Sequence, residues 1–178
     1  KIDAANLSIS NNTQRIKVLS ELENNLEGFS GSVKKVISDG KRGILKGIVG
    51  TVSQVINVDA KYALAVETAL GAAMQNIVVD TEADAKEAIE YLKSNRLGRV
   101  TFLPISSQEG RRLDNEDRVM ANDGAVSVAS DVVECDNTIK NVIEALLGRT
   151  VIMDNMDNAV KLAKATHYKF KIVTLAGE

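Results

Sequence analysis

The chain repeats itself at a constant offset of 77 residues. The first copy begins at Gly47 and the second at Gly124, and the two align without a gap as far as Gly71 and Gly148. A solenoid stacks three or more shorter units, so two long copies predict two related subdomains instead. A duplicated fold also presents two similar edges, which suit symmetric self-association. The pairs identical across the copies are Gly47/Gly124, Val49/Val126, Ser53/Ser130, Val55/Val132, Asp59/Asp136, Glu67/Glu144, Leu70/Leu147 and Gly71/Gly148.

Each copy alternates predicted strands with predicted helices, which indicates an α/β fold. Asp59 and Asp136 are good N-caps for the first long helix of each copy, and a glycine closes each of these helices. We expect strands over residues 47–56, 76–80 and 100–103 in the first copy, with helices over 60–70 and 81–94. In the second copy we expect strands over 125–133, 150–153 and 170–175, with helices over 137–147 and 155–165.

The segment that precedes the repeat carries a weak heptad pattern. Ile2, Ile9 and Ile16 recur at seven-residue spacing, with Leu19 and Leu26 at matching positions. This spacing predicts one strand of a coiled coil whose partner helix lies elsewhere. We therefore divide the chain into a coiled-coil arm over 1–27 and two subdomains over 28–105 and 106–178.

The composition is that of a globular protein in a reducing compartment. The 178 residues are 44% apolar and 26% charged, which is enough for one or two small domains. No apolar run reaches membrane-spanning length, and no secretory signal opens the chain. The single cysteine, Cys135, excludes an internal disulfide and a cysteine-rich zinc site, and its place in the repeat predicts a buried apolar role. Because the first residue is lysine and the last segment stops in mid-pattern, we expect a piece of a longer protein, and the reducing compartment indicates a cytoplasmic one.

The charge of −2 is unevenly distributed. Between Gly28 and Gly50 five cations face one carboxylate, Asp39, for a local charge of +4. Such a segment indicates either a local polyanion contact or an ordinary solvated face. Aromatic residues make up 3% of the chain, which argues against a base-stacking platform and favours contact with phosphates. The five cations are Lys34, Lys35, Lys41, Arg42 and Lys46.

Catalytic motifs are nearly absent. His167 is the only histidine, which excludes a multi-histidine metal site, and no phosphate-binding glycine loop follows a strand. The repeated Glu67 and Glu144 are interpreted as solvated or paired side chains. Gly40-Lys-Arg-Gly43 has the G-x-x-G form of KH domains, provided that helices flank it on both sides. We expect no enzyme, cofactor or metal, with an α/β ligand-binding domain and a KH-like RNA binder as the alternatives.

The ordered motifs of residues 28–178 resemble one family. They are Gly28-Phe-Ser-Gly-Ser-Val33, Gly47-Ile-Val-Gly50, Tyr62-x-x-Ala65-Val-Glu-x-x-Leu70-Gly71, Gln75-Asn-Ile-Val-Val79, Ala88-Ile89-x-x-Leu92, Gly98-Arg-Val-Thr-Phe-Leu-Pro104, Leu147-Gly148, Ala159-x-x-Leu162-Ala163 and Lys171-Ile-Val-Thr-Leu175. Together they resemble the hinge domain of SMC (structural maintenance of chromosomes) proteins, of the bacterial homodimeric type. The resemblance implies a mixed α+β hinge of two pseudo-repeated subdomains at the apex of an antiparallel coiled coil, whose far end carries an ATPase head.

The resemblance also implies partners and site residues. Two hinges would join by pairing edge strands into a homodimer, which serves chromosome condensation and segregation at the nucleoid. Binding of DNA would be weak and salt-sensitive, with no membrane and no small-molecule substrate. The implied dimer contacts are Arg99, Val100, Thr101, Phe102, Ile172, Val173, Thr174, Leu175 and Gly177. The implied DNA contacts are Lys34, Lys35, Lys41, Arg42 and Lys46, with Arg111 and Arg112 behind them.

Overall fold

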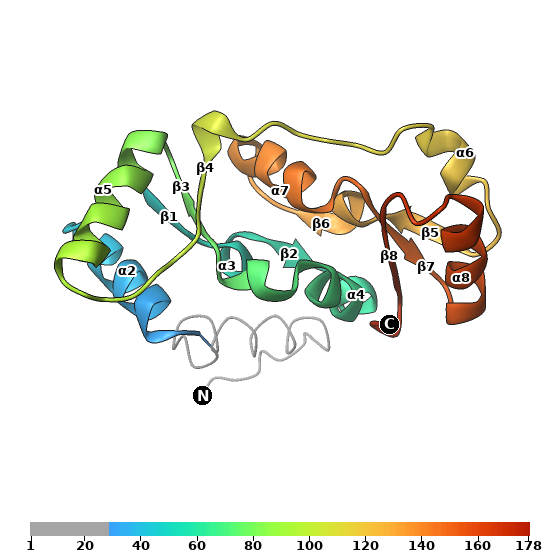
Figure 1. The fold of residues 1–178 in the computed structure, drawn as a ribbon, viewed down its shortest axis with the longest axis horizontal. Coiled ribbons are helices and arrows are strands. Elements are labelled where there is room, and N and C mark those ends of the chain that lie inside the picture. The colour runs from blue at the N-terminus through green and yellow to red at the C-terminus, as the bar shows by residue number, and fades with distance from the viewer. Residues whose placement is uncertain (1–28) are drawn as a thin grey trace. The chain divides into compact units, whose positions relative to one another are not determined.

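The computed structural model describes residues 29–178, which fold into two units (Figure 1). The predicted arm over 1–27 lies outside the described residues. Unit 1 comprises the described residues up to Ile56 together with Ala72–Gln108, and unit 2 comprises Asn57–Gly71 and Glu109–Glu178. The segment Asn57–Gly71 therefore belongs to unit 2, whereas the contiguous division expected from the sequence assigned it to the first subdomain.

Unit 1 is a small three-stranded sheet covered by helices. The strand order is β1-β3-β4, with β1 antiparallel to β3 and β3 parallel to β4. Val36, Ile77, Val79 and Ala88 are fully buried in its core. The elements are α2 (Gly31–Lys41), β1 (Ile48–Thr51), α3 (Val52–Val55), β3 (Ile77–Val79), α5 (Glu82–Ser94), β4 (Phe102–Pro104) and the 3-10 helix η2 (Ile105–Ser107). The 3-10 helix η1 (Gly71–Gln75) begins at the last residue of the unit 2 segment.

Unit 2 repeats this plan. Its main sheet has the order β5-β7-β8, with β5 antiparallel to β7 and β7 parallel to β8, and a second small sheet pairs β2 with β6. The helices are α4 (Ala60–Leu70), α6 (Glu116–Met120), η3 (Ala129–Val132), η4 (Asn137–Ile139), α7 (Lys140–Leu147) and α8 (Met156–Ala165). The strands are β2 (Asn57–Val58), β5 (Ala125–Val128), β6 (Val133–Glu134), β7 (Thr150–Met153) and β8 (Lys171–Thr174).

The repeat in the sequence corresponds to a repeat in backbone pairing. β1 and β5 occupy the same repeat positions, and each has one irregularity in its antiparallel pairing, after Ile48 in β1 and after Ala125 in β5. The glycine that precedes each strand has a positive φ, 73° at Gly47 and 82° at Gly124. Each glycine carbonyl accepts an N–H from the residue that follows the paired strand, from Asp80 after β3 at 2.9 Å and from Asp154 after β7 at 2.8 Å. The prediction of two related α/β subdomains is confirmed.

Two strand predictions were too long. We expected one strand over residues 47–56, but the observed strand β1 ends at Thr51. It ends there because Thr51 and Gln54 form a capping box that starts α3. The Thr51 Oγ1 accepts from the Gln54 N–H at 3.2 Å, and the Gln54 Oε1 accepts from the Thr51 N–H at 2.9 Å. The run over 125–133 is likewise interrupted by η3. The Thr-x-x-Gln pattern at Thr51 and Gln54 was the sequence feature that could have predicted this helix start.

The KH-like interpretation of Gly40–Gly43 is wrong. α2 continues through Gly40 to Lys41, and the next regular element is strand β1 rather than a helix. Gly40 is a packing position, because a Cβ there would lie 2.8 Å from the Cβ of Ile48. Gly40 and Gly43 therefore lie at the end of a helix, where Gly40 packs against strand β1, and they do not form a loop between two helices.

The two repeated aspartates are helix caps, as predicted. The Asp59 carboxylate accepts from the Lys61 N–H at 3.3 Å, and the Asp136 carboxylate accepts from the Thr138 N–H at 2.9 Å. This backbone N–H, together with the Thr138 hydroxyl, lowers the pKa of Asp136 because both bonds favour the ionised form.

Candidate dimerisation edges and nucleic-acid surface

The first candidate edge is β4 in unit 1. The Thr101 carbonyl accepts the Ile77 N–H at 2.9 Å, so Thr101 faces β3. Because peptide groups alternate along a strand, the N–H and C=O of Phe102 face away from β3, where residues 29–178 supply no further strand to this sheet. Arg99 and Thr101 are exposed, whereas Val100 and Phe102 pack against the unit 1 core.

The second candidate edge is β8 in unit 2. The Leu175 N–H donates to the Met153 carbonyl at 3.0 Å, so by alternation Ile172 and Thr174 face away from β7. The chain following β8 covers one of these outer positions. The Thr174 N–H donates to the Glu178 carbonyl at 3.1 Å, and the Thr174 carbonyl accepts from the Gly177 N–H at 2.9 Å. The N–H and C=O of Ile172 are therefore the outward-facing peptide groups of β8 that the chain after β8 does not cover.

Burial divides the predicted contact residues of β8 into two groups. Val173 and Thr174 are 2% and 0% exposed within the described chain, so their side chains belong to the interior of unit 2. Ile172, Leu175 and Gly177 are half-buried. The strand prediction thus identified an edge strand, but two of its side chains face inward.

Helix α4 packs against β8, and this packing explains why the segment that contains α4 belongs to unit 2. The Lys171 ammonium donates to the Ala69 carbonyl at 2.9 Å. A Cβ on Gly177 would lie 2.8 Å from the Leu64 Cγ, so glycine is required for the close approach of the chain to α4. The sequence pattern predicted the helix itself but gave no signal for its packing partner.

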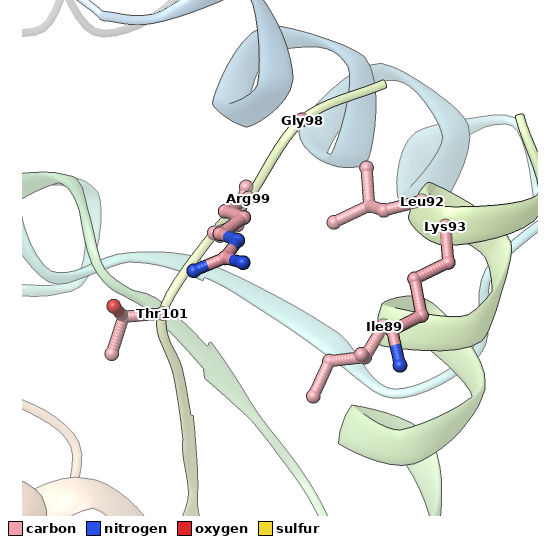
Figure 2. Close-up of a pocket in the computed structure, with 7 residues that line it drawn as sticks. Ile89, Leu92, Lys93, Gly98, Arg99 and Thr101 are labelled. Carbon is pink, nitrogen blue, oxygen red and sulfur yellow. The ribbon is translucent and has the colours of Figure 1, made fainter. Parts of the chain in front are cut away.

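A hollow of about 360 Å³ lies between α5 and the extended segment that leads into β4. Figure 2 shows Ile89, Leu92 and Lys93 on α5, with Arg99 and Thr101 on the extended segment. Gly98 and Val100 complete the lining. The lining combines aliphatic side chains with two cations and contains no carboxylate, imidazole or thiol. It therefore offers no general acid–base pair of the kind that the ligand-binding alternative would need for catalysis.

The predicted basic segment is formed by α2 and the loop that follows it. Val33, Val36 and Ile37 bury one face of α2 in the unit 1 core, which leaves its cations on the opposite side. Lys34, Lys41, Arg42 and Lys46 are exposed, and Lys35 is half-buried. Lys34, Lys41 and Lys46 have no ion pair with any residue from 29 to 178.

Asp39, which the sequence analysis counted only as a charge, is fully buried beneath this segment. Its Oδ1 lies 3.3 Å from the Lys35 ammonium and 3.8 Å from the Arg42 guanidinium, and its Oδ2 accepts the Tyr91 hydroxyl at 2.6 Å. This bond, together with burial and the Asp39 charge, raises the pKa of Tyr91. A single acid within a basic segment was the sequence feature that could have pointed to a paired role for Asp39. The sequence could not identify its partner Tyr91, which is 52 residues away.

Arg112 is fully engaged by carboxylates. Its Nε and Nη2 donate to Glu116 at 2.9 and 2.8 Å, and its Nη1 and Nη2 donate to Asp131 at 2.9 Å each. Nη1 also donates to Glu144 at 3.4 Å, which confirms a paired role for Glu144. The five N–H donors of the guanidinium are thereby used, and the pKa of Arg112 is raised. Arg111 is exposed, so the two predicted DNA contacts differ: Arg111 is accessible and Arg112 is occupied.

The remaining reactive side chains of the described chain are scattered. His167 is exposed in a left-handed turn after α8, and Cys135 is half-buried, with its pKa raised by desolvation. Among residues 29–178 no cluster of three His, Cys, Asp or Glu side chains is arranged to hold a metal ion. In the same part of the chain no helix has both the length and the apolar character needed to cross a membrane.

Comparison with known proteins gives one consistent result. The family model for the SMC proteins Flexible Hinge Domain matches residues 45–163. The chain is 42% identical to the chromosome partition protein Smc of Halothermothrix orenii over 164 residues, which are 92% of this chain. It is 39% identical to that of Bacillus subtilis over 163 residues, 90% of this chain. The chain spans 14% of the length of each of these relatives.

Solved structures give the same result. The crystal structure of an asymmetric dimer of the Geobacillus stearothermophilus SMC hinge domain matches 94% of this chain and 68% of that chain, with 39% identity and a TM-score of 0.82. The Pyrococcus furiosus SMC protein hinge domain matches 90% of this chain and 80% of that chain, with 34% identity and a TM-score of 0.70. With the duplicated β-α-β units and the resemblance of their motifs, these matches establish that the chain belongs to the SMC hinge domain family.

Proposed function

We propose that this chain is the dimerisation hinge of a chromosome partition protein and that it joins a second copy of itself through the edges of β4 and β8. Each unit presents one such edge, and in each unit it belongs to the strand that is parallel to the central strand. A closed two-fold dimer needs two surfaces that can meet in equivalent pairs, and a duplicated unit supplies them. The single observation that carries the proposal is this duplicated outer strand.

The relatives support the proposal. The Geobacillus stearothermophilus hinge was crystallised as an asymmetric dimer, and its match covers 94% of this chain. The residues proposed to contact the second copy are Arg99, Val100, Thr101 and Phe102 on the β4 side, with Ile172, Leu175 and Gly177 on the β8 side. Val173 and Thr174 are left out, because their side chains are buried in unit 2 and the outer peptide groups of Thr174 already bond to Gly177 and Glu178.

The test is sedimentation equilibrium of the 178-residue chain over a concentration range from micromolar to hundreds of micromolar. The proposal expects a reversible monomer–dimer equilibrium described by one dissociation constant. A chain that stays monomeric over this range would contradict the proposal, and so would a continuous ladder of larger species. Open growth of that kind would mean that the edges pair without closing a ring.

We infer that the hinge also binds DNA weakly through phosphate contacts. The proposed surface consists of Lys34, Lys35, Lys41, Arg42 and Lys46, with Arg111 on unit 2 as a separate contact. Arg112 is left out because its donors already bind three carboxylates. Exposed cations with few aromatic neighbours favour binding that is independent of sequence and falls steeply as salt rises.

The DNA contact is tested by a low-salt gel shift with duplex DNA. The chain should retard the duplex at low salt and release it as salt is raised. Combined replacement of Lys34, Lys41 and Lys46 by alanine, which keeps both ion-pair partners of Asp39, should weaken the retardation and leave the circular dichroism spectrum unchanged. Equal retardation by the folded variant would rule out this surface as the binding site.

The proposed role is mechanical and needs no catalytic group in this chain. In this proposal the hinge belongs to a longer homodimeric SMC protein of the cytoplasm and nucleoid, which condenses and segregates chromosomes, and ATP hydrolysis belongs to a head domain elsewhere in that protein. The hinge needs no cofactor, metal or small-molecule substrate for this role.

A further inference from the structure

We propose that Asp39 is a built-in counter-anion of the basic surface, which holds Lys35 and Arg42 and limits how strongly that surface binds a polyanion. The inference rests on the proposed DNA contact and adds to it the residue that sets its strength. Asp39 does not touch the DNA in this proposal. It acts through the two cations that it holds.

The geometry joins one buried anion to two accessible cations. The Asp39 side chain is 0% exposed, whereas the side chains of Lys35 and Arg42 are 40% and 65% exposed. Both cations approach the same oxygen, Oδ1, at 3.3 and 3.8 Å. No hydrogen bond within the described chain reaches this oxygen, so the two ion pairs are what offset its charge there. A buried carboxylate is stable only when such partners compensate it.

The carboxylate is held in place and has little freedom to turn away from the cations. Its other oxygen accepts the Tyr91 hydroxyl at 2.6 Å, which ties Asp39 to α5. Its backbone carbonyl accepts the N–H groups of Ile44 and Leu45 at 2.9 and 3.2 Å. The anion is therefore a fixed part of the surface, and a phosphate that approaches Lys35 or Arg42 must share the cation with it.

The repeat provides an internal comparison. At the offset of 77, Lys35 corresponds to Arg112 and Asp39 corresponds to Glu116. In both units the cation reaches the carboxylate four residues later, at 3.3 Å in unit 1 and 2.8 Å in unit 2. In unit 2 the pairing is complete, because two further carboxylates take the remaining donors. In unit 1 the pairing is partial, so Lys35 and Arg42 can still bind a phosphate, but more weakly than unpaired cations would.

The direction of the effect follows from the local charge. With Asp39 ionised, five cations and one anion give +4, and without it the surface carries +5. Each additional phosphate that is neutralised adds about 0.9 to the slope of log K against log salt on duplex DNA. Replacement of Asp39 by the uncharged Asn should therefore tighten binding several-fold at low salt and steepen the slope by up to about 0.9.

The experiment is a fluorescence-anisotropy titration of a labelled 30-base-pair duplex over a series of salt concentrations. Wild type is compared with Asp39→Asn and with Glu87→Gln, which makes the same change in net charge at an exposed position of α5. The inference expects tighter binding and a steeper slope for Asp39→Asn, with Glu87→Gln close to wild type. A folded Asp39→Asn that binds like wild type or more weakly would overturn the inference, and so would an equal gain for Glu87→Gln.

A second comparison does not depend on replacing a buried residue. Lys34 and Lys35 are adjacent on α2, but only Lys35 is paired with Asp39. Lys34→Ala should lower the salt slope by about 0.9, whereas Lys35→Ala should lower it by clearly less, because the Lys35 charge is already partly offset. Equal losses from the two variants would overturn the inference even if Asp39→Asn failed to fold.

The outcomes separate this inference from the proposed DNA contact. Binding by wild type with an unchanged slope in Asp39→Asn would contradict the counter-anion role alone. Binding that emerges only in Asp39→Asn would support the counter-anion role and show that wild type is held below the detection limit. The absence of binding by both proteins at low salt would contradict both proposals.

Discussion

Arg112 donates two parallel hydrogen bonds to Asp131, from Nη1 to Oδ1 and from Nη2 to Oδ2, each at 2.9 Å. This fork joins the segment that enters α6 to η3, and the same guanidinium also holds Glu116 and Glu144. A planar arginine can make such a set of contacts, whereas a lysine ammonium cannot reproduce it.

Replacement of Arg112 by lysine should therefore destabilise the chain. The carboxylates are 30–48% exposed, so each pair is screened by solvent, and we expect a total loss of about 1 kcal/mol. Urea unfolding followed by circular dichroism measures the change. Arg111→Lys is the matched control, because its side chain is exposed, and equal losses in the two variants would contradict the role of the fork.

Gly148 should not tolerate alanine. Its φ of −69° is ordinary for any residue, but a Cβ would overlap the carbonyl oxygen of Arg111. Because backbone cannot yield as a flexible side chain does, we expect Gly148→Ala to cost on the order of 2–4 kcal/mol or to prevent folding. Thermal unfolding tests this against Gly31→Ala, where a Cβ meets nothing within 4 Å. A Gly148→Ala variant as stable as the Gly31→Ala control would refute the argument.

The phenol of Tyr91 should ionise above the ordinary tyrosine pKa of about 10, because its proton is donated to Asp39. A raised folded-state pKa means that this contribution to stability is present below about pH 10 and is lost as pH rises through the folded pKa. The difference in absorbance at 295 nm between wild type and Tyr91→Phe isolates this titration. In Asp39→Asn the same titration should move to lower pH, and an unmoved titration would show that Asp39 is not its cause.

The thiol of Cys135 should react slowly in the folded chain. Burial raises its pKa, so less reactive thiolate is present near neutral pH than in a free cysteine. Reaction with Ellman's reagent at pH 7.5 should be several-fold slower in the native chain than in the urea-unfolded chain. Native and unfolded chains that react at the same rate would indicate a freely exposed thiol.

The outer edge of β8 can be blocked at Ile172, whose N–H faces away from β7 by strand alternation. Ile172→Pro removes this donor without breaking a bond inside the sheet, as edge strands tolerate. Ile172→Ala is the matched control, because it removes the same apolar side chain but keeps the N–H. We expect the proline variant to dimerise at least about tenfold more weakly than the alanine variant, since it also loses an edge hydrogen bond and its ring hinders pairing. Equal dissociation constants by sedimentation equilibrium would place the contact elsewhere.

Local patterns predicted most of the fold. Apolar spacing indicated the helices that became α4, α5, α7 and α8, and the caps at Asp59 and Asp136 are where the sequence placed them. The repeat at 77 residues predicted two related units, and the ordered motifs identified the hinge family. The helices and caps depend on neighbours a few residues away, so they are readable from local spacing, whereas the repeat and the family resemblance come from comparing whole segments.

The same local reasoning failed where a second local signal competed with it. The strand predicted over 47–56 ended at Thr51 because a capping box outweighed the β-branched run around it. The KH-like alternative at Gly40–Gly43 was wrong because a four-residue pattern says nothing about which element follows it.

Tertiary structure alone decided the contacts that matter for the proposals. Tyr91 meets Asp39 across 52 residues, and Lys171 meets the Ala69 carbonyl across 102 residues. The amino-acid types at these positions permit many partners, and only the packing of helices onto the sheets selects one. The sequence by itself therefore determined that the chain is a duplicated α/β fold, because periodicity and capping are local, and its ordered motifs supplied the resemblance to the hinge family. The three-dimensional fold determined that Asp39 is buried under the basic surface, that Arg112 is occupied and that α4 belongs to unit 2, because each depends on groups brought together from distant parts of the chain.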